Sequence, residues 1–149
     1  MLLKDLCTLE AVCCTRDTTI RAIARLMQRH HTGDLIVLDA LVDERRPAGM
    51  VTDRDIVLKV IARDLDPDKV TAGEVMASPL VIGSAREDTA VALERMRSNG
   101  VRRLPVTDER GAILGIVTLD DLLREHAERA QALLGVVMRE QTLERRGRE

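Results

Sequence analysis

Apolar residues are spaced along the chain in two ways, one typical of helices and one typical of strands. Four apolar residues between Ile20 and Met27 would lie on one face of a helix, which predicts a helix over residues 17–30. The same spacing recurs within residues 87–98, where the positions expected to face inward are Thr89, Ala92, Leu93 and Met96. Short apolar runs predict strands at residues 11–14, 35–38, 48–51, 80–82, 104–106 and 112–117.

The ends of these elements carry residues that favour caps and turns. Asp17 or Thr18 can cap the first helix, because their side-chain oxygens accept hydrogen bonds from backbone N–H groups. Thr32-Gly33 and Asn99-Gly100 follow the two helices, where glycine readily adopts the left-handed conformation that ends a helix. Pro105 lacks an N–H group, so we expect it at an edge position or at the first residue of a strand.

The second half of the chain repeats the first. Gly49-Met50-Val51-Thr52-Asp53-Arg54-Asp55 reappears 66 residues later as Gly115-Ile116-Val117-Thr118-Leu119-Asp120-Asp121, and upstream of these turns the best offset is 69. The difference falls in the turn at residues 39–47, where a change of length is tolerated. The repeat spans residues 2–59 and 71–125, joined by the polar residues 62–70. We therefore predict an α/β (α+β) protein in which two pseudo-symmetric β-α-β-β-α halves form one globular unit.

Each repeated turn places a hydroxyl and a carboxylate at a strand-to-helix junction. Unpaired backbone N–H groups at the start of a helix attract anions, and a duplicated site of this kind indicates binding rather than catalysis. The alternative interpretation is structural: Thr52 and Thr118 cap the helices, and Asp55 and Asp121 complete capping boxes. The two roles are compatible with each other.

Composition excludes several classes of function. The 149 residues are 45% hydrophobic and 32% charged but contain no Phe, Trp or Tyr, so no aromatic side chain can stack on a nucleobase. A formal net charge of −2 gives no basic footprint for nucleic acid. No apolar run approaches the roughly 20 residues that span a bilayer, and Met1-Leu2-Leu3-Lys4-Asp5 lacks the apolar segment of a signal peptide. We expect a cytoplasmic protein without nucleic-acid or membrane partners.

Cysteines and histidines provide weaker candidates for chemistry. Cys13-Cys14 could sense oxidation or bind a metal, but vicinal cysteines rarely bridge each other. A thiolate metal site would need more ligands than Cys7 and the three scattered histidines supply. We expect the cysteines to be apolar fillers, the histidines to face solvent, and no metal site. The sequence contains neither a nucleophile–base set nor a Gly-Lys-Thr phosphate loop, so we expect no enzymatic activity.

The order of elements, the duplication and the paired Gly-x-x-Thr-x-x-Asp turns resemble a tandem pair of cystathionine β-synthase (CBS) domains. The resemblance covers roughly residues 2–126. Leu104-Pro105-Val106 is also similar to the Leu-Pro-Val strand of that family, whereas the first half has Ile36 in place of the proline. We assign residues 2–62 to a first CBS domain, 71–130 to a second, and 135–149 to a C-terminal tail, of which we expect residues 144–149 to be solvated and frayed.

The resemblance implies a regulatory sensor that binds AMP, ADP, ATP or S-adenosylmethionine in clefts between the two CBS motifs. Such a protein would form a homodimer, act on a partner in trans and require no other cofactor. The alternative is a ligand-independent module for dimerisation or protein interaction, because segments 56–61 and 122–134 carry more apolar residues than one buried face requires.

By motif match, the resemblance also assigns roles to residues. It implies that Asp55 and Asp121 hold ribose hydroxyls and that Thr52 and Thr118 contact ribose or phosphate. The adenine would lie against the first strand of a half, which here corresponds to Cys13-Cys14-Thr15 and Ile82-Gly83-Ser84.

The two sites should differ in charge. Arg102 and Arg103 match Gly33 and Asp34 in the repeat, and Arg54 adds a positive charge inside the first turn. Guanidinium groups bind phosphates through two oxygens at once, whereas a carboxylate repels them. We predict that one cleft prefers phosphorylated ligands, and that the other is empty or takes a less charged adenosyl compound.

Overall fold

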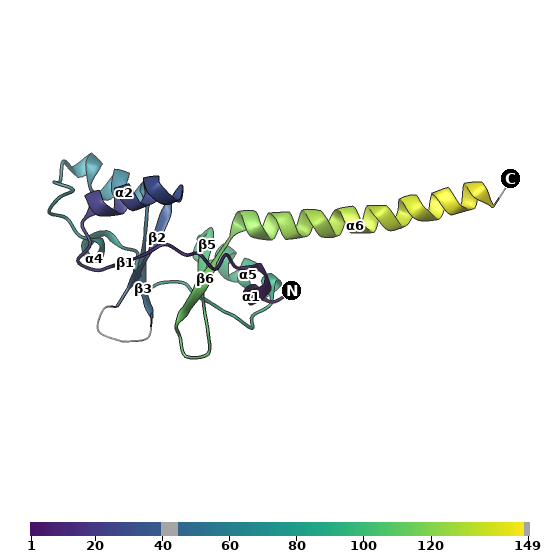
Figure 1. The fold of residues 1–149 in the computed structure, drawn as a ribbon, viewed down its shortest axis with the longest axis horizontal. Helices are drawn as coiled ribbons and strands as arrows, with labels where there is room; N and C mark the ends of the chain where they lie inside the picture. Colours follow the sequence, from purple (N-terminus) through teal and green to yellow (C-terminus); the bar gives the residue numbers. More distant parts are fainter. Residues whose placement is uncertain (40–44, 148–149) are drawn as a thin grey trace.

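The computed structural model describes residues 1–39 and 45–147, and it confirms the strand-helix-strand-strand-helix order of each half (Figure 1). The first half contains β1 (Cys13–Thr15), α2 (Ile20–His30), β2 (Asp34–Leu38), β3 (Pro47–Thr52), α3 (Asp53–Lys59) and a short 3₁₀ helix, η1 (Ile61–Arg63). The second contains β4 (Gly83–Ser84), α5 (Thr89–Asn99), β5 (Arg103–Thr107), β6 (Ile113–Thr118) and α6 (Leu119–Arg146). One-turn helices, α1 (Leu3–Leu6) and α4 (Ala72–Val75), precede the halves. Most of the turn that differs in length, residues 40–44, lies outside the described residues.

The two halves have the same sheet topology. β1 pairs in parallel with β2, which pairs antiparallel with β3, and β4, β5 and β6 repeat this arrangement. The expectation for Pro105 was wrong, because it lies within the middle strand β5, opposite Ile116. β4 pairs with β5 only at Val106 and Thr107, so the missing N–H of Pro105 falls beyond the short parallel ladder.

The helix ends differ in detail from the sequence expectations. Thr19, rather than Asp17 or Thr18, caps α2 and accepts a hydrogen bond from the Ala22 N–H at 3.3 Å. His31, with φ of 50°, ends α2 in place of Thr32-Gly33, whereas Gly100, with φ of 64°, ends α5 as expected. On α5 the inward positions are as predicted except Leu93, which is 37% exposed.

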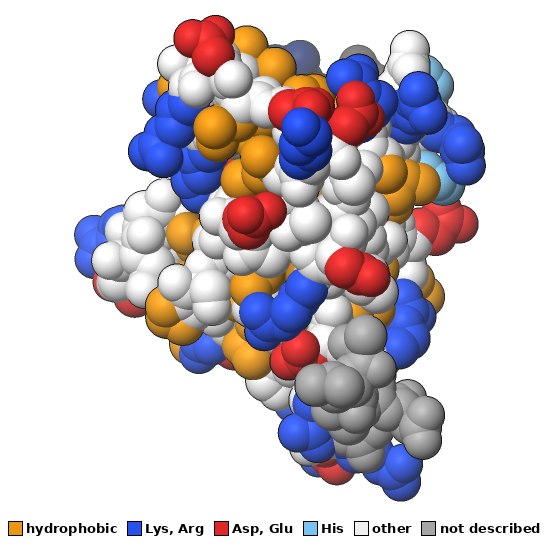
Figure 2. Space-filling model, turned by 90° about the vertical axis from the view of Figure 1, so that its left-hand side faces the viewer, with side chains coloured by type: hydrophobic (Ala, Val, Ile, Leu, Met, Phe, Trp, Pro, Cys, Tyr) orange, Lys and Arg blue, Asp and Glu red, His pale blue; other side chains and the backbone are white. Residues whose placement is uncertain are grey.

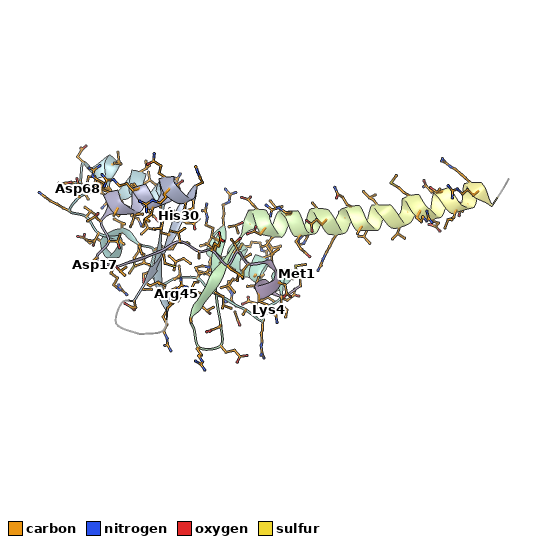
Figure 3. All side chains as sticks on the ribbon, in the orientation of Figure 1. Met1, Lys4, Asp17, His30, Arg45 and Asp68 are labelled. Atoms are coloured by element: carbon orange, nitrogen blue, oxygen red, sulfur yellow. The ribbon has the colours of Figure 1, made fainter. Side chains whose placement is uncertain are left out.

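The short helices α1 and α4 are exchanged between the halves. Leu3 of α1 is fully buried in the core of the second half, and Ala72 and Val75 of α4 belong to the core of the first. Matching backbone bonds hold them: the Leu3 N–H donates to Glu87 and the Ala72 N–H to Thr18. Met1 and Lys4 accordingly lie beside the second half in Figure 3, and the chain then crosses to β1 (Figure 1). Each half therefore completes its core with a segment that precedes the other half in sequence.

Helix α6 extends well beyond the sheets (Figure 1). The expectation of a separate tail from residue 135, frayed from residue 144, was wrong, because α6 continues through Gly135 to Arg146, although this segment is exposed as expected. Residues 148–149 of that tail lie outside the described residues. Within residues 1–39 and 45–147, no helix combines the length and apolar character needed to cross a membrane. Figure 2 shows the opposite end of the molecule, where charges of both signs are mixed with small hydrophobic patches.

Candidate functional site

Both repeated turns form capping boxes. The Asp55 N–H donates to Thr52 Oγ1 at 3.2 Å, and the Thr52 N–H donates to Asp55 Oδ2 at 3.0 Å. Thr118 and Asp121 repeat the arrangement at 3.2 and 2.9 Å. The structural interpretation of the turns is therefore confirmed. The reciprocal hydrogen bonds hold each threonine and aspartate in fixed positions. They use only one carboxylate oxygen of each aspartate.

The backbone donors at the start of α3 are not available to an anion. The Asp53 N–H donates to the Gly33 carbonyl at 2.9 Å, the Arg54 N–H to Asp53 Oδ1 at 2.8 Å, and the Asp55 N–H to Thr52. At the second turn, the Leu119 N–H donates to the Arg102 carbonyl at 2.8 Å. The expectation that unpaired N–H groups at this turn attract anions was therefore wrong for α3, because these groups have protein acceptors.

A cavity of about 320 Å³ brings the second turn together with the first half of the chain. Thr118 and Ile116 of β6 line it from the second half, and Thr32, just before β2, and Asp34, its first residue, line it from the first. The remaining lining residues are Thr8, Glu10, Ala11, Val12 and His30. His30 is exposed, as expected for the histidines, and Figure 3 shows it at the end of α2. The cavity therefore lies between the two halves.

The strand residues proposed to lie against adenine are placed elsewhere. Cys14 is 8% exposed and belongs to the core of the first half, and Thr15 is hydrogen-bonded to Asp17 and Thr18. Gly83 is buried against Leu3, whereas Ile82 is 37% exposed. None of these four residues lines the cavity, which contacts the chain just before β1, at Ala11 and Val12.

The cavity residues Thr8, Glu10, Ala11, Val12 and Thr32 were missed by the sequence reasoning. Thr8 approaches the second turn through an antiparallel bridge to Ile116, and its counterpart in the repeat, Ala77, forms the equivalent bridge to Met50. A bridge between segments so far apart in sequence leaves no periodic signal, although the offset of 69 relates the two bridged residues.

Arg103 and Asp34, which occupy equivalent positions of the repeat, form an ion pair with each other. Arg103 Nε lies 2.7 Å from Asp34 Oδ2, and the two side chains are 36% and 14% exposed. Burial raises the pKa of Asp34, nearby Arg103 opposes that shift and Asp53 adds to it, so the pKa lies above its usual range. Arg103 is therefore engaged by a carboxylate, while the side chains of Arg102 and Arg54 are exposed.

The remaining oxygen of each turn aspartate has a different environment. Asp55 Oδ1 lies 2.9 Å from Lys59 Nζ, whereas Asp121 Oδ1 lies 3.8 Å from the exposed Arg124. An ionised carboxylate has only acceptors and can receive both hydroxyls of a diol. The second turn thus has the less occupied carboxylate, and it is also the turn whose Thr118 lines the cavity.

Comparison with known proteins identifies relatives of the whole duplicated region. The family model for the CBS domain matches residues 3–62 and 72–128. Hypoxic response protein 1 of Mycobacterium tuberculosis is 35% identical over 127 residues, which are 85% of this chain and 86% of that protein. An uncharacterized protein of Methanopyrus kandleri is 33% identical over 102 residues, 68% of this chain, and the chain spans 50% of that protein's length.

Solved structures show the same architecture. Hypoxic Response Protein I with two coordinated zinc ions matches at a TM-score of 0.73 and 35% identity, over 83% of this chain and 98% of that one. A CBS domain protein from Pyrobaculum aerophilum complexed with AMP matches at a TM-score of 0.74 and 26% identity, over 82% and 90%. Among the described residues of the present chain, no group of three or more His, Cys, Asp or Glu is arranged to hold a metal ion.

Proposed function

Because the chain belongs to the CBS domain family and carries two such domains in tandem, we propose that it senses an adenosyl compound bound in the cavity between its halves. The chain is a regulatory protein and not an enzyme, since the two CBS domains occupy most of it and a CBS domain-containing relative matches it over 81% of that relative's length. We assign residues 2–62 and 71–130 to the two domains. It acts in trans, on a separate partner protein.

The observation that carries the proposal is the position of Thr118, which lines a cavity between the halves, while its capping partner Asp121 uses only one carboxylate oxygen in the cap. A volume of about 320 Å³ is at the lower end of the range for small-molecule sites, roughly 300–1,000 Å³. Ala11, Val12 and Ile116 provide the apolar surface for a base. The AMP complex of the Pyrobaculum aerophilum protein supports an adenosyl ligand.

Thermal unfolding followed by circular dichroism tests this function, using AMP, ADP, ATP, S-adenosylmethionine, NADH and the guanine counterparts. A ligand at about 100 times its dissociation constant should stabilise the protein by about 2.7 kcal/mol. Asp121→Asn, which keeps the shape of the side chain but replaces one acceptor oxygen with a donor, should weaken binding at least tenfold. The proposal is wrong if the protein shows no shift with any adenosyl compound.

A second candidate function is interaction through helix α6. Leu123, Ala127, Ala130, Leu134 and Val137 are spaced as in a coiled-coil seam. This stripe begins at a small apolar cavity of about 140 Å³ lined by Leu93, Leu119, Leu122, Leu123 and His126. Leu134 and Val137 are 61% and 48% exposed, so a second copy of the helix could cover them. This supports a homodimer as the alternative to ligand sensing.

Sedimentation separates this alternative from the sensor. The protein should be a dimer at micromolar concentration, and Leu134→Glu together with Val137→Glu should make it a monomer. Ala132→Glu introduces a charge at an exposed position on the face of α6 opposite this stripe and should leave the dimer intact. A monomeric wild-type protein rules the α6 dimer out.

A further inference from the structure

The ion pair between Asp34 and Arg103 lies at the wall of the candidate cavity. We propose that Asp34 selects the ligand by charge: paired with Arg103, it admits uncharged or positively charged adenosyl compounds and disfavours phosphorylated ones. This inference rests on the proposed function, and it assigns a ligand class and a specificity residue to the cavity.

The repeat explains why the two residues meet. Asp34 lies at the start of β2, paired in register with Thr52, and Arg103 lies at the start of β5, paired with Thr118. Equivalent positions of the two halves approach each other where the halves join, so opposite charges there form a contact between the halves. Asp34 Oδ2 and Arg103 Nε are 2.7 Å apart, and Asp34 itself lines the cavity beside Thr118.

The charges around the cavity oppose a phosphate. Its lining includes two carboxylates, Glu10 and Asp34, and the exposed His30. Asp53 is close enough to Asp34 to raise the pKa of that carboxyl. Arg103, the partner of Asp34, already donates to a carboxylate. These carboxylates therefore repel a dianionic phosphate at this wall, whereas they attract a cation and do not repel a neutral nucleoside.

A contact between Arg103 and a phosphate would not remove the repulsion by the carboxylates. A phosphate at Arg103 would share the guanidinium with Asp34, whose carboxylate stays beside it and whose side chain is only 14% exposed. A carboxylate that is mostly removed from water and loses its partner is strongly disfavoured, so the pair resists opening. Removing the charge of Asp34, by contrast, would leave Arg103 without that competitor and able to bind two phosphate oxygens.

Calorimetric titration of wild type and Asp34→Asn with adenosine, S-adenosylmethionine and ADP at about 50 mM salt tests the inference, because surface charges are weakly screened at this ionic strength. Wild type should bind adenosine and S-adenosylmethionine at least tenfold more tightly than ADP, and Asp34→Asn should shift this ratio at least tenfold towards ADP. Adding Arg103→Gln should abolish the gain. Asp64→Asn removes the same charge at an exposed position with φ of 54°, which asparagine tolerates, and should change nothing.

The double exchange Asp34→Arg with Arg103→Asp provides a variant that keeps the ion pair if Asp34→Asn does not fold. It places the guanidinium on the cavity side and should favour ADP. A wild-type preference for ADP, or the same ratio in wild type and in these variants, would overturn the inference.

Inorganic pyrophosphate separates this inference from the proposed function. At low salt, pyrophosphate should protect Asp34→Asn against thermal unfolding more than it protects wild type. If no adenosyl compound binds any variant, the sensor function fails, but the pyrophosphate comparison still decides whether Asp34 excludes phosphate. Equal protection of both proteins would contradict the role of Asp34.

Discussion

Lys59 Nζ lies 2.9 Å from Asp55 Oδ1, the carboxylate oxygen that the capping box of the first turn leaves free. At the second turn the corresponding oxygen of Asp121 has only Arg124, at 3.8 Å, and that arginine is 70% exposed. The two turns share a sequence motif and a capping geometry, but only the first has a lysine ammonium directly against the remaining carboxylate oxygen. The duplication has therefore preserved the turn and its cap but not the surroundings of the second carboxylate oxygen.

Lys59→Gln should make the first turn competent for a ligand. The substitution removes the cation at Asp55 Oδ1 and leaves the Thr52 capping box in place, so calorimetry should show stoichiometry rising from one adenosyl ligand per chain towards two. Arg63→Gln, the same loss of charge in η1, serves as the matched control and should keep one ligand per chain. An unchanged stoichiometry in Lys59→Gln would mean that Lys59 does not block this turn.

Asp55 should also contribute a pH-dependent part of the stability. Burial raises the pKa of its carboxyl, but the hydrogen bonds from the Thr52 N–H, Lys59 and the Thr52 hydroxyl outweigh burial, and the pKa lies below its usual range. A carboxylate with a lowered folded pKa stabilises the fold above its unfolded pKa of about 3.9, and loses this contribution as the pH falls through the folded value.

Urea unfolding of wild type and Asp55→Asn measures that contribution. At pH 7 the substitution should cost about 1 kcal/mol, as expected for a damaged helix cap. The difference should shrink when the pH is lowered from about 5 to about 2, because wild type then loses the same charge. Asp5→Asn, at an exposed position, should be neutral throughout. A cost of Asp55→Asn that stays constant with pH would show that the charge does not matter.

Because α1 packs into the second half, a substitution at residue 3 should destabilise the core of that half. Leu3 is fully buried in the core of the second half, so Leu3→Ala should lower the free energy of unfolding by about 2–5 kcal/mol. Leu9 is 72% exposed, and Leu9→Ala should stay within about 0.5 kcal/mol of wild type. Equal effects in chemical denaturation would contradict the placement of α1.

Two glycines should respond in opposite directions to alanine. A Cβ at Gly115 would lie 2.2 Å from the Thr8 carbonyl oxygen, so Gly115→Ala should separate the bridge between these segments and destabilise the protein. At Gly135, within α6, a Cβ meets nothing within 4 Å, and Gly135→Ala should stabilise the helix by up to about 1 kcal/mol. Melting temperatures that move in the same direction for both variants would contradict this prediction.

The sequence predicted the repeated elements well because local spacing determines them. Ile20 and Met27 identify α2 through helical periodicity, and the Thr-x-x-Asp turns identify the starts of α3 and α6 through capping chemistry. The prediction that the tail begins at Gly135 failed because this glycine does not end α6. A Cβ there would meet nothing within 4 Å, and most neighbouring residues have good helix propensity.

Contacts between segments far apart in the sequence could not be predicted from local spacing. The contact of Arg103 with Asp34 depends on how the halves dock, and no periodicity in either segment reports it. The approach of Ala11 and Val12, rather than Cys14 and Thr15, to the second turn depends on the same docking. The sequence thus identified which charged and hydroxyl side chains belong to the candidate site. Which residues they contact became clear only from the three-dimensional structure.

The crossing of α1 and α4 makes the chain indivisible despite its duplicated sequence. A protein cut within the joint would yield two pieces, each lacking the short helix that closes its own core and carrying the one that closes the other. We therefore expect that neither piece folds as an autonomous domain. Mixed together, however, the two pieces contain every contact of the intact chain, and each would fold only by recruiting the other.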